Sequence, residues 1–376
     1  MKRKRFILLA VILLLVFTAC SNQQKTVESQ TDKASTKVDS KKEAWEQELY
    51  ELAKKEGKIS IVGWPSENRE ALLEEFEKEY PGIKVNFIGM RYTDAMVKLR
   101  EEQNNGKYLA DVQIEGLAAQ FDDLNKYIVN PDIKNDDNWH GGFAKGFDAL
   151  KGSNYEGQYI YGVQASPQIL INNDVIPEGE IKTFEDLLKS EYSGKIVGYD
   201  FSIRGQSTVT LTGLARAKGE DFVTELLEKG KPVVVKDHRQ IANWFATGRY
   251  PIVIGIDTTQ LEEFKEKGVV KNIQTLRVEK ANTYQPFALA VLKNPPNPNA
   301  TKLFVNWYLS KKGQEKFVDL IGIYQSRRTD VPEVQNEYTI PWSQIEQEND
   351  VPMTSVEGTK TEDWVLEQGK NYKAGN

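Results

Sequence analysis

Cysteine and histidine are almost absent from this sequence. Its 376 residues include one cysteine and two histidines, His140 and His238. One thiol cannot form a disulfide within the chain, and two imidazoles are too few for a histidine-rich metal site. The chain also lacks a Gly-x-Ser-x-Gly nucleophile elbow and a His-Glu-x-x-His metal motif. We therefore expect neither a cofactor nor enzymatic activity; the less favoured alternative is a secreted hydrolase with one of these histidines as its base.

An excess of positive charge is also lacking. Lysine and arginine number 49 against 55 aspartates and glutamates, so the formal net charge is -6 at pH 7. Phosphate backbones repel an acidic chain, and we expect no nucleic acid as a partner. The composition is 39% hydrophobic and 28% charged, which suits well-packed globular domains, and 376 residues are enough for two of them.

A long apolar run occurs at one place, the N-terminus. Basic residues at positions 2–5 precede an apolar run at 6–19. That run is short for a transmembrane helix, which needs about 20 apolar residues, and it fits a signal peptide. The sequence Val-Phe-Thr-Ala-Cys at 16–20 resembles a bacterial lipobox, in which the cysteine is lipidated; Phe17 replaces the usual leucine. We expect residues 1–19 to be a signal peptide and Cys20 to carry acyl chains such as palmitate; an incidental cysteine after a plain secretory leader is the alternative.

Residues 20–42 have no aromatic side chain and are rich in Ser, Thr, Gln and Lys. Such a segment cannot bury a core and is expected to be a flexible tether. With a lipidated Cys20 the protein would be anchored in the cell membrane, and its folded body would lie on the extracytoplasmic face.

The first folded motif predicts a ligand-binding edge. An apolar strand at 59–63 is followed by a turn at 64–68, a helix at 69–80 and a second strand at 83–87. This is a βαβ pattern, and open α/β sheets bind ligands where such a strand ends and the next helix begins. Trp64, Ser66 and Glu67 lie at that place. The alternative is an ordinary strand-to-helix turn in which Ser66 or Asn68 caps the helix.

The same alternation of strand, polar turn and helix continues along the chain. A third strand at 110–116 contains Glu115, and strands at 159–163 and 168–172 follow. Thr183 and Asp186 have the spacing of a capping box at a helix start. Further elements are predicted as strands at 195–199, 232–235, 252–256 and 286–292, and as helices at 93–104, 208–218, 237–247, 299–309 and 311–321.

The turn at 200–207 has the residues of an anion site. Arg204, Gly205, Gln206 and the hydroxyl of Ser207 lie at a helix N-terminus, where backbone N–H groups and the helix dipole attract a phosphate, phosphonate or carboxylate. On this hypothesis an Arg204→Ala change removes solute binding. The alternative is that Arg204 is a surface charge and Ser207 a helix cap.

Several stretches in fixed order carry a family resemblance. They are LAKKEGK at 52–58, ALLEEFEKEYPGIKV at 71–85, ADV at 110–112, TFEDLL at 183–188, YSGKI at 192–196, KNPPNPNA at 293–300 and LSKKGQ at 309–314. On these stretches the body from Glu43 to Arg328 resembles the extracellular solute-binding proteins of bacterial ABC importers. It is most similar to the branch that includes ferric-iron, polyamine, thiamine and phosphonate binders.

The resemblance implies an α/β fold with two lobes, of the type II periplasmic-binding-protein kind, with two hinge crossovers near 164–167 and 281–286. The implied boundaries are lobe 1 at 43–165 and 282–345, lobe 2 at 166–281, and a C-terminal tail at 346–376. Trp342 and Trp364 are possible docking anchors of the tail region. It also implies a monomer that binds a small-molecule solute and delivers it to an ABC permease in the membrane.

The resemblance leaves the solute open. The iron-binding relatives use a histidine near the first helix and an adjacent tyrosine pair in lobe 2. Here residues 67–71 contain no histidine and 255–259 no tyrosine, so a tyrosinate iron site is not expected. Our first hypothesis is a small anionic organic solute: a phosphonate, sugar phosphate or carboxylate. The second is ferric iron, another metal or a cationic solute held by Glu115, Asp200 and Asp257. A surface adhesin is a further alternative.

Aromatic and hinge residues complete the expected site, since Tyr199 and Tyr284 could stack on an organic solute and Gln164 lies on a predicted crossover. The candidate ligand-binding residues are Trp64, Ser66, Glu67, Arg91, Tyr92, Glu115, Gln164, Tyr199, Asp200, Arg204, Gly205, Gln206, Ser207, Asp257, Thr258 and Tyr284.

Overall fold

The structure is a computed structural model. It describes residues 42–90, 92–114, 126–129, 133–134, 137–140, 159–165, 169–277, 283–322, 324–335, 339–341, 351–352 and 356–374. The chain divides into two compact units, residues 1–42 and 43–376, and every element below belongs to the second. The predicted signal peptide, Cys20 and most of the tether lie outside the described residues.

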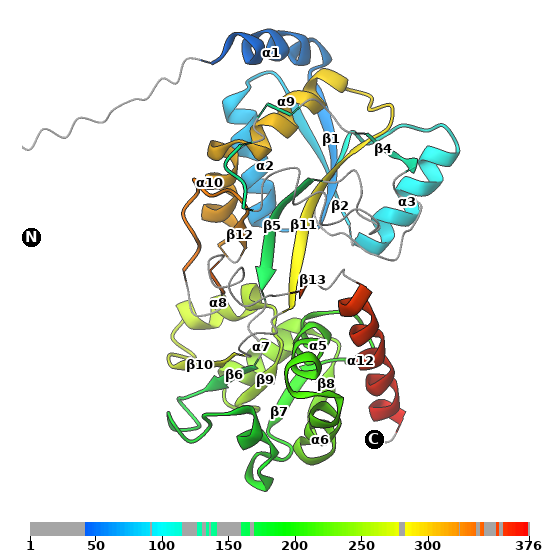
Figure 1. The fold of residues 1–376 in the computed structure, drawn as a ribbon. Helices are drawn as coiled ribbons and strands as arrows, with labels where there is room; N and C mark the ends of the chain where they lie inside the picture. Colours follow the sequence, from blue (N-terminus) through cyan, green and yellow to red (C-terminus); the bar gives the residue numbers. More distant parts are fainter. Residues whose placement is uncertain are drawn as a thin grey trace, which may run out of the picture. The chain divides into compact units, whose positions relative to one another are not determined.

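The first of two sheets in this unit is mixed (Figure 1). Its strand order is β12-β5-β11-β3-β1-β2, and β4 and β13 also pair with β11. β1 runs parallel to β2 and β3, whereas β11 is antiparallel to β3 and β5. The strands are β1 (Lys58–Gly63), β2 (Lys84–Gly89), β3 (Val112–Ile114), β4 (Ile128–Val129), β5 (Tyr159–Ala165), β11 (Thr283–Leu292), β12 (Gln325–Ser326) and β13 (Val351–Pro352).

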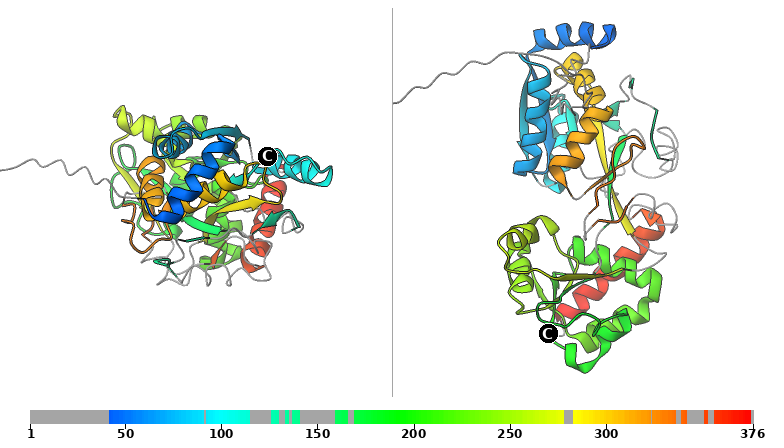
Figure 2. Two further views of the ribbon diagram at one scale, coloured as in Figure 1. Left: turned by 90° about the horizontal axis from the view of Figure 1, so that it is seen from above. Right: turned by 90° about the vertical axis from the view of Figure 1, so that its left-hand side faces the viewer.

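In the described part of the chain, five α-helices pack around this sheet, and two pairs of them join the start of the chain to its end. The helices are α1 (Ala44–Glu56), α2 (Glu67–Glu79), α3 (Tyr92–Asn104), α9 (Pro298–Leu309) and α10 (Lys311–Ile321). α1 packs beside α9, and α2 beside α10, so the N-terminal helices and the returning chain share one core (Figures 1 and 2). Phe76 on α2 packs edge-on against Phe304 on α9, with ring centroids 5.2 Å apart.

The second sheet has the strand order β10-β6-β9-β7-β8. β7 is parallel to both β8 and β9, whereas β6 is antiparallel to β9 and β10. The strands are β6 (Ile169–Asn172), β7 (Ile196–Tyr199), β8 (Val233–Val235), β9 (Ile252–Ile254) and β10 (Ile273–Leu276). The helices are α5 (Gln206–Lys218), α6 (Glu220–Gly230), α7 (His238–Ala246), α8 (Thr258–Glu266), α12 (Val356–Ala374) and the 3-10 helices Phe184–Leu188 and Ser190–Tyr192.

Each sheet has its own hydrophobic core, so the body consists of two lobes. Buried side chains of the first sheet cluster with α1, α2, α9 and α10, and those of the second cluster with α5, α6 and α7 on its two faces. The strands β5 and β11 pair over most of their length, with Gln164 opposite Gln285. β5 leads toward β6 of the second sheet and β11 returns from β10, so the chain crosses between the sheets twice, as the sequence predicts. The exact lobe boundaries stay a prediction.

Local sequence signals account for many element boundaries. The hydroxyl of Ser66 accepts a hydrogen bond from the Arg69 N–H at 3.2 Å and caps α2, so the capping alternative for Ser66 is confirmed. Asp186 accepts from the Thr183 N–H at 2.9 Å, as the capping-box spacing predicts. The helix that follows is 3-10 and not α. The elements that were not predicted include α6, α8 and β10.

The C-terminal helix α12 is a further element that was not predicted, because the composition of this segment is polar. The sequence suggested a polar tail, but residues 356–374 form a helix that packs beside α5. Val365 is buried in the second core and Trp364 packs against it, so Trp364 does serve as a docking anchor. Trp342 lies outside the described residues. A Cβ added at Gly369 would come within 2.3 Å of the Phe201 backbone, so a glycine is required for this close approach.

One buried carboxylate holds three segments of the first lobe together. Asp111, immediately before β3, is fully buried. It accepts hydrogen bonds from the Ser60 N–H at 2.8 Å, the Asn297 N–H at 2.7 Å and the Asn297 amide at 2.8 Å. β1, β3 and the residue before α9 are thereby tied to a single side chain. Removing it would leave three buried donors without an acceptor.

We predict that Asp111→Ala lowers the free energy of unfolding by about 2–4 kcal/mol, because desolvated donors lose a charged partner. Urea denaturation monitored by circular dichroism measures this change. Asp319→Asn is the matched control, since Asp319 is exposed on α10 and its change should have almost no effect. Equal stability of the Asp111→Ala and wild-type proteins would contradict the role of this carboxylate.

Candidate functional site

Three helix N-termini meet at one edge of the second sheet. The parallel strands β7, β8 and β9 end at Tyr199, Val235 and Ile254, and α5, α7 and α8 begin a few residues later. Since carboxyl ends of parallel strands lie at the same edge, the unpaired N–H groups and positive dipole ends of the three helices gather there. This edge is the second lobe's half of the candidate site.

A flat aromatic pair lies at the same edge. The rings of Tyr199 and His238 stack at 4.2 Å with an interplanar angle of 2°. Burial lowers the pKa of His238, and the charges of Asp257 and Asp237 oppose this only in part, so the imidazole is neutral at pH 7. Tyr199 was a predicted site residue and His238 was not. The position of His238 immediately after a strand, at a helix start, was the signal that could have identified it.

Ser207 joins three elements of the second lobe. Its hydroxyl is buried, accepts from the Tyr199 N–H at 2.8 Å and donates to the Ile254 carbonyl at 2.6 Å. These bonds join β7, β9 and α5. Gly255 has φ +61°, and a Cβ there would lie 2.3 Å from the Gln206 carbonyl oxygen. The Ser207 hydroxyl thus donates its proton within the fold, and binding of the solute by this hydroxyl stays a prediction.

Arg204 is also engaged within the protein. Its guanidinium forms an ion pair with Glu362 and a second with Asp363 at 2.8 Å, both on α12. The Glu362 carboxylate is buried, so this contact helps to dock the C-terminal helix. Two carboxylates beside one guanidinium leave a net negative charge, which disfavours a bound anion at Arg204. The structure thus gives Arg204 a docking role where the sequence suggested an anion contact.

The remaining predicted residues of the second lobe have varied roles. Asp200 is buried and accepts from the N–H of Ser202 at 3.0 Å and from its hydroxyl at 2.6 Å, which shapes the turn before α5. Gly205 caps α5 in an extended conformation, and Gln206 is its first residue. Thr258 is the first residue of α8 and is buried. Asp257 immediately precedes α8.

The first lobe offers a similar edge where β1, β2 and β3 end. Trp64 follows β1 directly and is 52% exposed, which suits a side chain that contacts a solute. Glu67 is exposed on the first turn of α2. A Cβ at Gly89, the last residue of β2, would lie 2.8 Å from the Pro65 side chain, so the loop after β1 packs closely on the end of β2.

Several predicted residues cannot be placed in full. Arg91 and Glu115 lie outside the described residues. The backbone of Tyr92 begins α3, and Gln164 and Tyr284 belong to the paired strands β5 and β11; the side chains of these three are not described.

A cluster that the sequence did not indicate lies in the first lobe. Arg69 is 3% exposed, and its charge acts on the phenols of Tyr161, Tyr308 and Tyr324. Burial raises the pKa of all three tyrosines, that of Tyr324 to about 12, and the positive charge of Arg69 opposes the rise. These residues come from α2, β5, α9 and the segment before β12. No spacing in the sequence connects them.

The described residues contain neither a metal-binding cluster nor a membrane-spanning helix. No group of three or more His, Cys, Asp and Glu side chains there could hold a metal ion. Within the same ranges, no helix combines the length and the apolar character needed to cross a bilayer.

Residues 71–341 match a family model described as bacterial extracellular solute-binding protein. Because this match covers well over half of the chain, the chain belongs to that family. The family resemblance inferred from the sequence is confirmed. Members of the family are transport proteins that bind solutes, which implies a small-molecule ligand and a membrane permease as partners. No curated protein sequence matches this chain.

Solved structures show the same fold at low sequence identity. Iron-bound HitA from Pseudomonas aeruginosa is similar with a TM-score of 0.63 and 14% identity, over 84% of this chain and 99% of that chain. The spermidine/putrescine-binding protein PotD from Streptococcus pneumoniae has values of 0.61, 16%, 84% and 99%. AfuA from Actinobacillus pleuropneumoniae with bound fructose-6-phosphate has 0.58, 17%, 84% and 98%. The predicted fold class, a two-lobed periplasmic binding protein, is confirmed.

The double ion pair of Arg204 leads to a prediction about stability. Arg204→Ala and Glu362→Gln should each destabilise the protein. A double-mutant cycle should give a coupling free energy of about 1 kcal/mol, because the Arg204 side chain is partly exposed and water screens its attraction to Glu362. Urea denaturation of the three variants measures it. Glu367→Gln is the control: Glu367 pairs with Lys370 on the exposed face of the same helix, and its loss should cost almost nothing.

The alternative reading of Arg204 predicts a different pattern. If Arg204 binds the solute, Arg204→Ala abolishes solute binding while the coupling to Glu362 is zero. Docking of α12 requires a measurable coupling with little loss of affinity.

Proposed function

We propose that this protein is the solute-binding component of a bacterial ABC importer, which captures a small organic solute between its two lobes and delivers it to a membrane permease. Family membership supports the proposal, as does the two-lobed fold with two chain crossings. Neither capture nor delivery needs a catalytic group.

The physical basis of capture is differential affinity. Each lobe presents the carboxyl ends of three parallel strands, the place where open α/β sheets bind ligands. A solute that contacts both edges stabilises the closed arrangement. The free energy of this stabilisation equals the difference between its binding free energies in the closed and the open arrangement. The permease would then recognise the closed arrangement.

We further propose that the solute carries an anionic group: a phosphate, phosphonate or carboxylate. The main support is the convergence of the N-termini of α5, α7 and α8 at one sheet edge, beside the stacked rings of Tyr199 and His238. Backbone N–H groups bind the anion in this proposal, and Arg204 is not needed. The aromatic pair and the exposed Trp64 would contact the carbon skeleton of the solute.

We also propose that Cys20 is lipidated and holds the protein on the outer face of the cell membrane. The support is sequence alone: the single cysteine of the chain follows an apolar leader and a lipobox-like segment, and precedes a polar tether. This arrangement would keep the binding body near its permease.

A thermal-shift screen tests the solute class. Full-length protein is melted with phosphonates, sugar phosphates, carboxylates, polyamines, thiamine and Fe³⁺. We expect an anionic organic solute to stabilise the fold, by about 2.7 kcal/mol at one hundred times its dissociation constant. Isothermal titration calorimetry on the best solute supplies that constant. Stabilisation by polyamines or Fe³⁺ alone would refute the anionic class, and stabilisation by no solute would count against the transport function.

A Cys20→Ser change tests the anchor. In a bacterial host that processes lipoproteins, the wild-type protein should sediment with membranes and incorporate labelled palmitate. The Cys20→Ser protein should lose the label, because serine has no thiol to acylate. Equal labelling of both proteins, or none in the wild type, would refute the lipid anchor.

A further inference from the structure

The second lobe has a cavity at the edge of its sheet that lies opposite the candidate functional site. Its volume is about 270 Å³, and its lining includes Ile176 after β6, Lys195 directly before β7 and Pro251 directly before β9. Because β7 and β9 are parallel and β6 is antiparallel to β9, these three places share one edge. The candidate functional site lies where β7 and β9 end. This hollow, which we call the distal cavity, is therefore separate from that site.

Buried side chains line part of the distal cavity. Ile176 and Tyr192 belong to a hydrophobic core of the second lobe. Gly248 has φ +75°, and a Cβ there would lie 2.5 Å from the Val175 side chain. Only a glycine lets the turn after α7 approach the turn after β6 so closely. Since these parts are held by the core, the shape of the distal cavity is set before any ligand binds.

Four charged side chains also line the distal cavity. They are Glu180, Glu191, Lys195 and Arg249. In the described part of the chain, none of the four forms an ion pair with another side chain. Two charges of each sign give the lining no net charge, so neither a simple anion nor a simple cation is favoured there.

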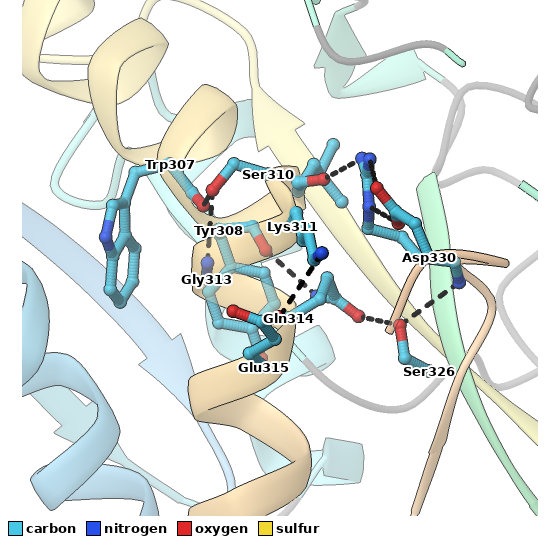
Figure 3. A network of polar contacts seen from close by, with 11 residues as sticks. Trp307, Tyr308, Ser310, Lys311, Gly313, Gln314, Glu315, Ser326 and Asp330 are labelled. Atoms are coloured by element: carbon cyan, nitrogen blue, oxygen red, sulfur yellow. Dashed lines mark hydrogen bonds and ion pairs between the residues drawn. The ribbon is translucent and has the colours of Figure 1, made fainter. Parts of the chain in front are cut away.

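A structural network of polar side chains looks different (Figure 3). In the first lobe the Ser326 hydroxyl donates to Gln314 at 2.7 Å, and Gln314 donates to the Tyr308 carbonyl at 2.9 Å. Asp330 pairs with Arg328 at 2.8 Å in the same place. There the polar groups bind one another and serve the fold. The charges of the distal cavity do not pair in this way and are available to a ligand.

Aromatic rings hold the two cations of the distal cavity apart from its carboxylates. Lys195 Nζ lies 6.0 Å from the centroid of the Tyr192 ring. Arg249 Cζ lies 4.6 Å from the centroid of the Trp244 ring. A cation over a ring face is attracted by the electrons of the ring, so both side chains are positioned without a carboxylate partner.

The two carboxylates lie by one phenol. Glu191 directly precedes Tyr192, and both residues line the distal cavity together with Glu180. Burial raises the pKa of Tyr192, and the charges of Glu191 and Glu180 raise it further, as expected for carboxylates close to its hydroxyl. The distal cavity thus has an acidic part beside this hydroxyl and a basic part at Arg249.

We propose that the distal cavity binds a small zwitterion, an α-amino acid with an apolar side chain. Glu180 and Glu191 accept hydrogen bonds from its ammonium group, and Arg249 and Lys195 donate to its carboxylate. Its side chain packs against Ile176. The volume of about 270 Å³ is just below the range of about 300–1,000 Å³ for drug-sized ligands, which suits a molecule of this size. The proposal does not depend on which solute is transported.

Analogues that lack one charge test the proposal. Full-length protein is titrated calorimetrically with L-alanine, L-valine, L-leucine and L-phenylalanine, and then with the N-acetyl and amide derivatives of the tightest binder. Each derivative should bind about tenfold more weakly, because it loses the hydrogen bonds of one charged group. Binding of none of the four amino acids, or equal affinity for the derivatives, overturns the proposal.

Fluorine spectroscopy tests where the amino acid binds. The protein is labelled with 5-fluorotryptophan, and resonances are assigned by single Trp→Phe changes. Trp244 contacts Arg249 of the distal cavity, whereas Trp64 lies at the candidate functional site. The amino acid should shift the resonance of Trp244 and leave that of Trp64 in place. A shift at Trp64 without one at Trp244 overturns the proposal, because it places the ligand at the other edge.

Variants of exposed residues separate this proposal from the transport function. Arg249→Gln and Glu180→Gln should each lower the affinity for the amino acid about tenfold and change the melting temperature little, because both side chains are exposed. Glu228→Gln is the matched control: Glu228 is exposed on α6 of the same lobe, outside the lining, and its change should leave affinity within twofold. The solute identified in the thermal-shift screen should bind all three variants as tightly as the wild type. Unchanged affinity of Arg249→Gln for the amino acid, or an equal loss in Glu228→Gln, overturns the proposal whatever the transported solute.

Discussion

The antiparallel pairing of β5 with β11 is the constraint on which the rest of the structure depends. Both strands belong to the first sheet. β5 is the last described strand before the chain enters the second sheet, and β11 is the first described strand after it returns. Sliding one strand against the other would break the hydrogen-bond ladder between them. The ladder therefore fixes β5 and β11 relative to each other.

Side chains that resemble ligand contacts in the sequence are largely used by the fold. Ser207 joins β7 to β9, Asp200 shapes a turn, and Arg204 docks α12. Each of these contacts pairs a buried or half-buried polar group with a partner. The fold requires such partners because a buried polar group without one is costly. The proposed site consequently relies on backbone N–H groups, aromatic faces and a few placed side chains. For this reason, a loop of polar residues beside a helix start is weak evidence that a ligand binds there.

Local patterns in the sequence predicted most elements but not all of them. β1 and α2 were read from an apolar run, a turn and a 3.6-residue period, and the capping residues Ser66 and Thr183 behaved as their types predict. β10 and α12 were missed because their faces are only partly apolar, and their stability comes from packing: β10 against β6, and α12 against α5. Helical propensity alone could not distinguish α12 from a polar tail.

The sequence by itself determined the alternation of strands and helices and the family, because these depend on neighbouring residues and on ordered motifs. Tertiary structure alone decided which side chains meet. Arg69 and Tyr324 are 255 positions apart, as the printed numbering shows, and lie within electrostatic reach only because α2 and α10 share a core. Contacts of this kind arise from packing between distant segments, and the pattern along the chain does not encode them locally.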